Sequence, residues 1–350
     1  MNGPPAPAGK VPVHVLTGFL GAGKTSLLRR LLASPALADT AVLINEFGEV
    51  GLDHLLVEAV DEDIVLLKSG CVCCTVRTDL KEGLVNLMER RRHGTLPPFT
   101  RVVLETTGIA DPGPIVATLI ADPMLRHQFR LGGIVTVVDV PNGVGNLASF
   151  PESLRQVAAA DRLAISKSDL ASPGEAAALA ERLSALNPSA TLVTLLPDEA
   201  PDIALLLADP ADEAHRAAEV RRWIEAAAAR EGGWRFHGHA GHEAGRHGDI
   251  RAFVIRAEAP LAWPRFALWL SMLLNRHGGE ILRLKGLLLI ENVAEPVVIQ
   301  GVQHLVHAPE HLKAWPEGVH GTQIVMIARG LDPALVQRSF DAFVGPGKAQ

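Results

Sequence analysis

Short apolar runs rich in β-branched residues alternate with longer helical patterns from residue 10 to about residue 226. Such alternation is typical of a mostly parallel sheet with helices on both faces, so we predict an α/β domain over residues 11–229. The predicted strands are Val13–Leu16, Ala41–Ile44, Ile64–Leu67, Val102–Glu105, Ile134–Asp139, Arg162–Ile165 and Ala190–Thr194. The predicted helices are Lys24–Ala33, Val76–Arg91, Pro114–Ile120, Glu175–Leu186 and Ala211–Ala228.

This pattern ends at residues 230–249, a stretch dominated by Gly and His that we interpret as a linker. Beyond it, residues 250–345 are predicted to form a smaller α+β domain. Its predicted strands are Ile250–Glu258, Gly286–Glu291, Pro296–Gly301 and Thr322–Ala328, and its predicted helices are Trp263–Asn275 and Asp332–Ala342. The Pro-rich and Ala-rich residues 1–10 are expected to be a disordered tail.

Composition agrees with two domains, because 350 residues with 48% hydrophobic content exceed what one ordinary core needs. The net charge of -6 argues against a general nucleic-acid surface. No charged-then-apolar leader is present, and the longest apolar stretch, near Phe266–Leu274, is too short to span a bilayer. We therefore expect a cytoplasmic protein that binds neither nucleic acid nor membrane.

The segment Gly18–Thr25 fits the phosphate-binding template G-x-x-x-x-G-K-[ST], and it lies between a predicted strand and a predicted helix. In such a loop, backbone N–H groups at a helix N-terminus surround phosphate oxygens. We expect Lys24 to reach the β- and γ-phosphates and the Thr25 hydroxyl to bind Mg²⁺. The expected nucleotide-binding residues of this loop are Gly18, Gly21, Ala22, Gly23, Lys24, Thr25 and Ser26.

Two further predicted strands end in polar motifs. Strand Val102–Glu105 continues into Thr106-Thr107-Gly108, where Glu105 is expected to hold a magnesium-bound water or to orient the attacking water. The Gly108 N–H is expected to sense the γ-phosphate. Ligands of such sheets bind at the carboxyl ends of the strands, which favours a catalytic role for these residues over an ordinary strand end.

The other strand, Arg162–Ile165, leads into Ser166-Lys167-Ser168-Asp169, which resembles the guanine-reading motif [NT]-K-x-D. Asp169 can accept both the ring N–H and the exocyclic amine of guanine, a donor pair that adenine lacks, so we predict GTP over ATP. Ser166 departs from the motif, and its short hydroxyl shortens the reach toward the base or the phosphate loop. The alternative to guanine specificity is a site that tolerates other nucleotide bases.

All three cysteines of the chain fall at Cys71, Cys73 and Cys74, just before a predicted helix. Neighbouring cysteines form strained disulfides, so we favour thiolates that share a soft or borderline metal. The helix N-terminus is expected to lower the pKa values of the thiols. Glu46 and Glu49, at another strand end, are candidates for the remaining ligand. Zinc suits such a set, and Co²⁺ or Ni²⁺ can bind the same ligands.

Taken in order, the segments Gly18–Thr25, Asn45–Glu49, Gly70–Cys74, Glu105–Pro114 and Ser166–Asp169 resemble those of the CobW-like family of metal-linked P-loop GTPases. The resemblance implies a GTPase of the metallochaperone group that binds zinc or a related ion at the Cys-x-Cys-Cys motif and delivers it to a client protein.

The resemblance continues past the linker, because Arg283–Gly286 and Gln300–Gln303 look like the carboxyl-terminal domain of that family. This second domain offers a surface for a client or for a second copy of the chain. One departure concerns Ile44, which occupies a place where the family often has an acidic residue. That loss argues against a secondary site made of carboxylates.

The linker histidines leave two interpretations open, a secondary metal store or an exposed flexible loop; they are His237, His239, His242 and His247. The histidines of the second domain share no compact ligand spacing and are expected to be ordinary; they are His304, His307, His311 and His320.

Our hypothesis is that GTP, Mg²⁺ and the metal act as one coupled unit. The γ-phosphate would order residues 45–53 and bring Glu46 or Glu49 toward the cysteines. No arginine finger is identifiable, so slow intrinsic turnover is expected. One alternative is a nucleotide-gated metal sensor or buffer with incidental GTPase activity. Another is an ATP-dependent kinase with a structural zinc, which the change Asp169→Asn would leave unaffected.

Overall fold

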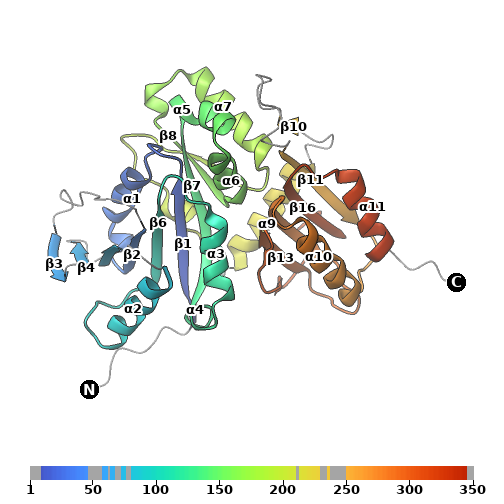
Figure 1. The fold of residues 1–350 in the computed structure, drawn as a ribbon, viewed down its shortest axis with the longest axis horizontal. Coiled ribbons are helices and arrows are strands. Elements are labelled where there is room, and N and C mark those ends of the chain that lie inside the picture. The colour runs from blue at the N-terminus through green and yellow to red at the C-terminus, as the bar shows by residue number, and fades with distance from the viewer. Residues whose placement is uncertain are drawn as a thin grey trace. The chain divides into compact units, whose positions relative to one another are not determined.

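The computed structural model describes residues 9–45, 57–61, 64–67, 72–75, 80–209, 213–228, 235–236 and 250–344. The chain divides into two compact units whose main boundary follows Asp209, and residues 157–159 and 180–191 group with the second unit. Figure 1 draws most of the first unit in blue to green, helix α9 in yellow, and most of the second sheet with α10 and α11 in orange to red.

The first unit is built on a nine-stranded sheet, counted over the described residues, with the strand order β3-β4-β5-β2-β6-β1-β7-β8-β9. The strands from β5 to β8 in this order run parallel to one another, whereas β4 is antiparallel to both β5 and β3. The strands are β1 (Val11–Gly18), β2 (Thr40–Asn45), β3 (Val57–Asp61), β4 (Ile64–Leu67), β5 (Val72–Thr75), β6 (Arg101–Thr106), β7 (Phe129–Asp139), β8 (Arg162–Ser166) and β9 (Thr191–Thr194).

Helices lie beside this sheet, and every residue of the central strand β1 is buried, as expected for a parallel strand covered on both faces (Figure 1). The described helices up to residue 209 are α1 (Lys24–Leu32), α2 (Leu80–Arg92), α3 (Pro112–Ala121), α4 (Pro123–Gln128), α5 (Val140–Ser149), α6 (Pro151–Ala159), α7 (Pro173–Leu186) and α8 (Ile203–Leu206). Short 3₁₀ helices η1 (Pro35–Leu37) and η2 (Ser168–Leu170) complete them.

Helix α1 shows why the sequence pattern gives this packing. Leu27, Leu28 and Leu31 recur at a spacing of three and four residues, so they share one face, and all are buried against the sheet residues Val42 and Val103. Burial of each leucine contributes about 1.5–3 kcal/mol of hydrophobic stabilisation. The same packing fixes the N-terminus of α1 at the end of β1.

The second unit contains a mainly antiparallel sheet with the strand order β10-β11-β16-β12-β13-β14, and β15 also pairs with β13. Its strands are β10 (Arg235–Phe236), β11 (Ile250–Ala257), β12 (Ile281–Leu288), β13 (Val297–Val302), β14 (Leu305–Val306), β15 (Glu310–His311) and β16 (Thr322–Arg329). Its helices are α9 (Glu213–Ala228), α10 (Trp263–His277) and α11 (Pro333–Val344).

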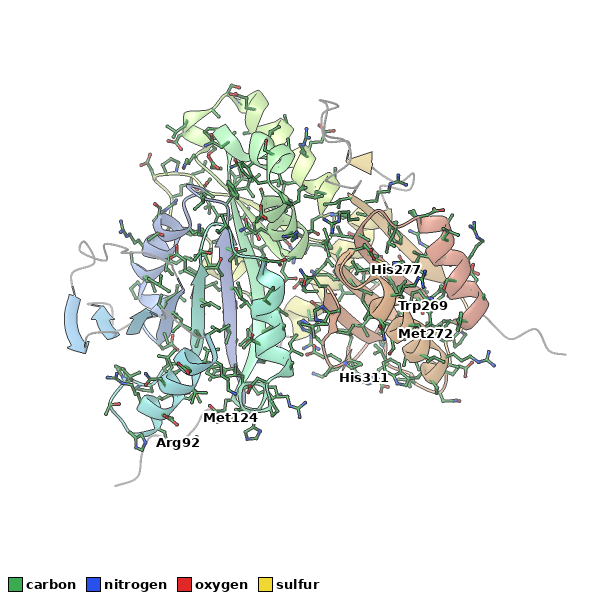
Figure 2. All side chains as sticks on the ribbon, viewed as in Figure 1. Arg92, Met124, Trp269, Met272, His277 and His311 are labelled. Carbon is green, nitrogen blue, oxygen red and sulfur yellow. The ribbon has the colours of Figure 1, made fainter. Side chains whose placement is uncertain are left out.

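Both faces of this second sheet are covered. Trp269 of α10, labelled in Figure 2, packs edge-on against Phe340 of α11 at 5.0 Å between ring centroids. Both belong to a core that includes alternate residues of β16. Val325, from the intervening positions, packs instead with Val220 and Trp223 of α9. Successive strand residues face opposite sides of a sheet, so the two helical layers lie on opposite faces.

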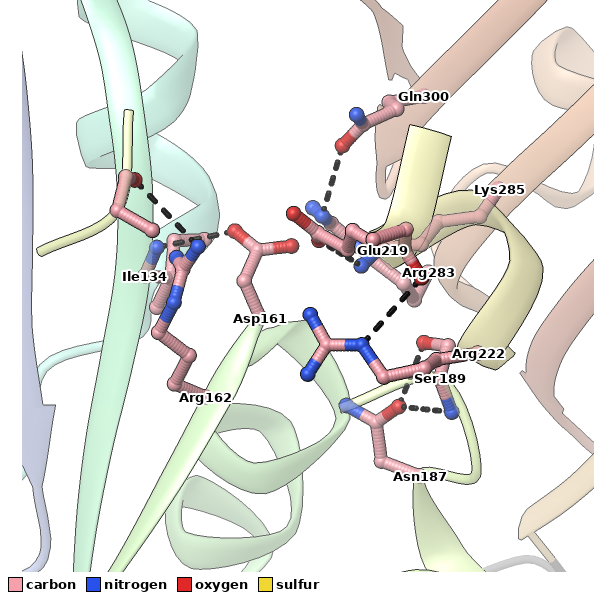
Figure 3. A network of polar contacts seen from close by, with 12 residues as sticks. Ile134, Asp161, Arg162, Asn187, Ser189, Glu219, Arg222, Arg283, Lys285 and Gln300 are labelled. Carbon is pink, nitrogen blue, oxygen red and sulfur yellow. Dashed lines mark hydrogen bonds and ion pairs between the residues drawn. The ribbon is translucent and has the colours of Figure 1, made fainter. Parts of the chain in front are cut away.

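Polar contacts support the position of α9. Lys285 of β12, in the predicted family-like segment, donates to the Glu219 carboxylate of α9 at 3.4 Å (Figure 3). Arg283 on the same strand donates to the Gln300 side-chain oxygen at 3.2 Å. The helix predicted over Ala211–Ala228 therefore exists, but it packs in the second unit and not in the first, where we had expected it.

The predicted fold class is confirmed: a P-loop type of parallel sheet with flanking helices, and a separate antiparallel-sheet domain. The apolar pattern did not predict the following elements: β3, β5, β10, β14, β15, α4, α5, α6 and α8. It also placed β12 at Gly286–Glu291, whereas the strand runs over Ile281–Leu288. None of the helices in the described part of the chain combines the length and apolar character that a bilayer crossing requires.

Candidate nucleotide site

The phosphate loop connects the carboxyl end of β1 to the first turn of α1, in the strand–loop–helix setting predicted for it. Gly18 has a φ of 145°, and a Cβ there would lie 2.3 Å from the Val137 carbonyl oxygen of β7. Only glycine fits this bend, because a side chain would collide with the neighbouring strand. The loop therefore turns tightly over the sheet and leads into the N-terminus of α1, and a helix N-terminus suits an anion because its first N–H groups have no acceptor within the helix.

Lys24 and Thr25, the first residues of α1, make the contacts expected of a phosphate-binding loop. The Lys24 ammonium is buried and lies 3.4 Å from the Phe19 carbonyl oxygen, so it is held over the loop. The Thr25 hydroxyl donates to Glu105 Oε1 at 2.6 Å. Glu105, at the end of β6, is 1% exposed. A buried carboxylate beside a hydroxyl is an oxygen donor set of the kind that Mg²⁺ prefers.

The segment after Glu105 lies directly against the phosphate loop. Thr106 donates its hydroxyl to Thr17 of β1 at 2.8 Å. A Cβ at Gly108 would lie 2.6 Å from Leu20 Cδ2 and 2.8 Å from Leu20 Cα. Gly108 is therefore required for this close approach, and its main chain stands beside the loop that is expected to hold the phosphates.

The predicted base-reading motif also contacts the phosphate loop. Ser166 donates its hydroxyl to the Ala22 carbonyl at 2.6 Å, and Lys167 donates its ammonium to the Gly21 carbonyl at 2.6 Å. The short Ser166 side chain thus reaches the loop, which we had expected it to reach less well. Lys167 adopts a φ of 55°, an uncommon conformation for a side-chain-bearing residue. Asp169 follows in η2 with an exposed carboxylate.

Asp139 and Gln156 belong to this site, although we did not predict them. Asp139 ends β7, is 1% exposed, and lies 3.7 Å from the Lys167 ammonium while it accepts from Asn142 at 2.6 Å. Gln156 of α6 donates its amide to the Gly108 and Ala110 carbonyls. An acidic residue at a strand end was a signal that could have revealed Asp139, whereas the sequence gives no signal for Gln156.

The predicted metal motif lies only partly within the described residues. Cys73 and Cys74 belong to β5, and the structure describes their backbone; Cys71, Glu46 and Glu49 lie outside the described residues. We expected the cysteines just before a helix; Cys73 and Cys74 lie within strand β5, residues 76–79 lie outside the described residues, and the described part of α2 starts at Leu80.

Strand β5 ends at the same edge of the sheet as β1. Cys74 pairs in register with Leu43 of β2, and Ile44 of β2 pairs with Glu105 of β6. In the order β5-β2-β6-β1, three strand intervals separate β5 from β1. With about 4.8 Å for each interval, the two strands lie about 14 Å apart.

Within the described ranges, no group of three or more His, Cys, Asp or Glu side chains is gathered to hold a metal. Like Cys71, Glu46 and Glu49, the histidines of residues 237–247 lie outside the described residues.

A second polar group lies toward the opposite ends of the same parallel strands. Asp161, just before β8, accepts from the Ile134 N–H at 3.0 Å, and Arg162 donates to the Ala208 carbonyl at 3.4 Å (Figure 3). His14 of β1 is buried, and Gly132 leaves room for its ring, since a Cβ there would lie 2.8 Å from it. Burial, with Arg162 nearby, lowers the pKa of His14 to about 3.

Comparison with known proteins identifies both parts of the chain. The family described as CobW/HypB/UreG, nucleotide-binding domain, matches residues 12–194, and the cobalamin synthesis protein cobW C-terminal domain matches residues 250–344. The zinc chaperone YjiA of Escherichia coli is 32% identical over 314 residues, which cover 90% of this chain and 93% of that protein.

Two further matches agree. The zinc-regulated GTPase metalloprotein activator 1 of Schizosaccharomyces pombe is 42% identical over 170 residues, covering 46% of this chain and 40% of that protein. The crystal structure of Zn(II)-bound YjiA GTPase from E. coli superposes with a TM-score of 0.70 at 28% identity, covering 96% of this chain and 99% of that one. The chain therefore belongs to the CobW/HypB/UreG family and is a P-loop GTPase of that family.

Proposed function

We propose that this GTPase is a metallochaperone that binds zinc, or a related divalent ion such as Co²⁺ or Ni²⁺, at Cys71, Cys73 and Cys74. Binding and hydrolysis of GTP would control the transfer of the metal to a client protein. The names of the relatives, a zinc chaperone and a zinc-regulated GTPase, support zinc as the cargo.

The observation that carries this proposal is the strand order at the carboxyl edge of the first sheet. The strand with Cys73 and Cys74 ends at the edge from which the phosphate loop starts, and β2 is its neighbour. The described part of β2 ends at Asn45, directly before Glu46 and Glu49 in the sequence, and β2 lies between the cysteine strand and β6. Ligands of parallel sheets gather at this edge.

In this proposal the described residues bind GTP as follows. The phosphate loop from Gly18 to Ser26 surrounds the phosphates, and Lys24 neutralises charge at the β- and γ-phosphates. Asp169 accepts the two guanine donors, while Ser166 and Lys167, bonded to the Ala22 and Gly21 carbonyls, fix the base-reading motif relative to the phosphate loop.

Thr25 and Glu105 would hold Mg²⁺, which when bound neutralises charge on the phosphate oxygens. Their 2.6 Å contact and the burial of Glu105 fit such a hard cation. Gly108 presents its N–H beside the loop for the γ-phosphate, and hydrolysis needs only positioning and charge stabilisation beyond this.

The shared edge of the sheet supports coupling between the two sites. We propose that the γ-phosphate orders residues 45–53 and brings Glu46 or Glu49 toward the cysteines, so that hydrolysis loosens the metal. Such coupling is reciprocal: zinc must change GTP affinity by the same factor as GTP changes zinc affinity.

The test is a pair of equilibrium titrations on the full chain, with zinc affinity measured in GDP and in a non-hydrolysable GTP analogue, and nucleotide affinity measured with and without zinc. We expect tighter zinc binding with the analogue, by a factor of about 5–150, and the same factor in the reverse titration. Replacement of Cys71, Cys73 and Cys74 by Ser should abolish the effect and leave nucleotide affinity without zinc unchanged.

Equal zinc affinity in both nucleotides would reject the coupling. Retention of tight zinc binding by the Ser variant would reject the cysteine site. If a client receives metal equally well with the analogue and with GTP, the protein is a buffer and not a chaperone driven by hydrolysis.

We also propose that the GTPase domain ends near Asp209 and that α9 belongs to the carboxyl-terminal domain, because the apolar face of α9 packs on the second sheet. This domain is the proposed surface for the client or for a second copy of the chain.

A further inference from the structure

The segment between β6 and α3 is anchored at both ends by its own side chains. At its start, Thr106 bonds to Thr17. At its end, Asp111 accepts from the Gly113 N–H at 2.9 Å and caps α3. Between these anchors, the chain makes a turn in which the Ala110 N–H donates to the Thr107 carbonyl at 3.2 Å. The side chain of Ile109 at this turn is 60% exposed.

The middle of this segment is held from a distant part of the sequence. Gln156 of α6 donates its amide nitrogen to the Gly108 carbonyl at 3.1 Å and to the Ala110 carbonyl at 3.0 Å. Gln156 is 1% exposed. One NH₂ group therefore joins the two carbonyls on either side of Ile109 and fixes the curvature of the turn.

The chemistry of the contact sets the orientation of the Gln156 amide. Only the NH₂ group can donate to two carbonyls, because a flipped amide would place its oxygen against both carbonyl oxygens. Gln156 Oε1 is buried and has no hydrogen-bond partner among the described residues. The side chain is thus placed for its donors, although its acceptor is left unsatisfied, and an unsatisfied acceptor carries a desolvation cost.

We propose that Gln156 is a positioning residue for recognition of the γ-phosphate. By holding the Gly108–Ile109 and Ala110–Asp111 peptides, it keeps the main chain of Gly108 against Leu20. It thereby restricts rotation at Gly108, which sets the direction of the Gly108 N–H in the preceding peptide. Its loss lowers affinity for a nucleotide with a γ-phosphate and leaves affinity for GDP unchanged. This inference rests on the proposed function, in which the Gly108 N–H meets the γ-phosphate.

The test compares Gln156→Met with Thr136→Val. Methionine keeps the length of the side chain and removes both donors. Thr136 donates its hydroxyl to the main-chain carbonyl of the same Gln156 at 2.8 Å and is 1% exposed, so valine there disturbs the same turn of α6 without touching the amide. Dissociation constants for GDP and for a non-hydrolysable GTP analogue are measured for both variants and the unmodified protein.

We expect Gln156→Met to weaken analogue binding about tenfold, on the scale of two neutral hydrogen bonds, and to change GDP binding less than about twofold. Thr136→Val should lower the melting temperature and keep the ratio of the two affinities. Unchanged GDP binding also shows that each variant is folded.

A second variant, Gln156→Glu, adds a pH readout. As a carboxylate it places oxygen against two carbonyl oxygens, and burial raises the pKa of such an acid. Its analogue affinity should recover as the pH falls, since the protonated acid can donate one bond.

The inference is overturned if Gln156→Met weakens the binding of GDP and of the analogue by the same factor. It is also overturned if Thr136→Val changes the ratio of the two affinities as much as Gln156→Met does. A failure of the proposed function looks different. If the Gly108 N–H does not meet the γ-phosphate, the unmodified protein itself will bind the analogue no more tightly than GDP.

Discussion

The two ends of the parallel strands in the first sheet carry similar polar residues with different surroundings. At the carboxyl ends, Lys24, Thr25 and Lys167 contact carbonyl or carboxylate oxygens around a loop that takes an anion. Toward the amino ends, Asp161 and Arg162 are buried and bond to main-chain groups of neighbouring segments.

The comparison shows that the presence of charged or polar side chains does not by itself identify a functional site. A charged group serves a ligand where the strands end in loops and helix N-termini, because the backbone there offers free N–H groups. The same type of group stabilises the fold where every partner comes from the protein itself. Variants at the two ends should therefore separate nucleotide affinity from stability.

The largest expected effect is that of Lys24→Met at the carboxyl ends. Removal of the ammonium should weaken GTP binding by about 100-fold or more, since a charge-assisted contact to the phosphates is lost. The free energy of unfolding without nucleotide should change by no more than about 1 kcal/mol. Nucleotide titration and urea unfolding measure the two quantities.

The matched variant at the amino ends is Asp161→Ala, which should lower stability and leave nucleotide affinity unchanged. A fall in GTP affinity for this variant as large as that for Lys24→Met would break the separation between the two ends.

His14 gives the next effect, on the pH dependence of stability. Burial and the nearby arginines, Arg162 first, hold the pKa of His14 near 3, below the value of 6.5 in the unfolded chain, although Asp209 opposes them. As the pH falls below 6.5, the unfolded state takes up the proton first, so stability is complete above pH 6.5 and is lost toward pH 3. Between pH 7.5 and pH 5 the loss from this residue is about 2 kcal/mol.

The measurement is urea unfolding of the unmodified protein and of His14→Val at both pH values. The variant should lose about 2 kcal/mol less than the unmodified protein between them. His14→Gln, which is polar and does not titrate, should behave as His14→Val does. An unchanged pH dependence in both variants would show that His14 is not a source of acid sensitivity.

Asp139→Asn is expected to have the smallest effect. It sharpens the comparison because Asp139 is buried, like Asp161 and Arg162, but lies at the carboxyl end of its strand. It should weaken GTP binding by about threefold, since Lys167 keeps its bond to the Gly21 carbonyl, its ion pair with Asp139 spans 3.7 Å, and the Lys167 side chain is 35% exposed, which weakens the pair. The GTP titration should show this without a change in the unfolding midpoint. A large loss of stability would instead group Asp139 with the structural residues.

Much of this protein follows from its sequence alone. Three features could be predicted from the sequence: the phosphate-loop template with its flanking strand and helix, the polar residues that end β6 and β8, and a second domain over residues 250–344. Each depends on neighbouring residues or on a short fixed spacing. The prediction of the family rested on the order of these motifs and is confirmed by the matches over both domains.

Tertiary structure decided what depends on residues far apart in the chain. The strand that contains Cys73 and Cys74 pairs between β4 and β2, whereas the local pattern suggested a loop before a helix. Helix α9 packs on the second sheet because its apolar face matches alternate residues of strands that come later in the sequence. Gln156 meets the Gly108 carbonyl across 48 positions. Local patterns encode strands, helices and loop chemistry, but strand order and long-range hydrogen bonds arise only when the whole core is packed.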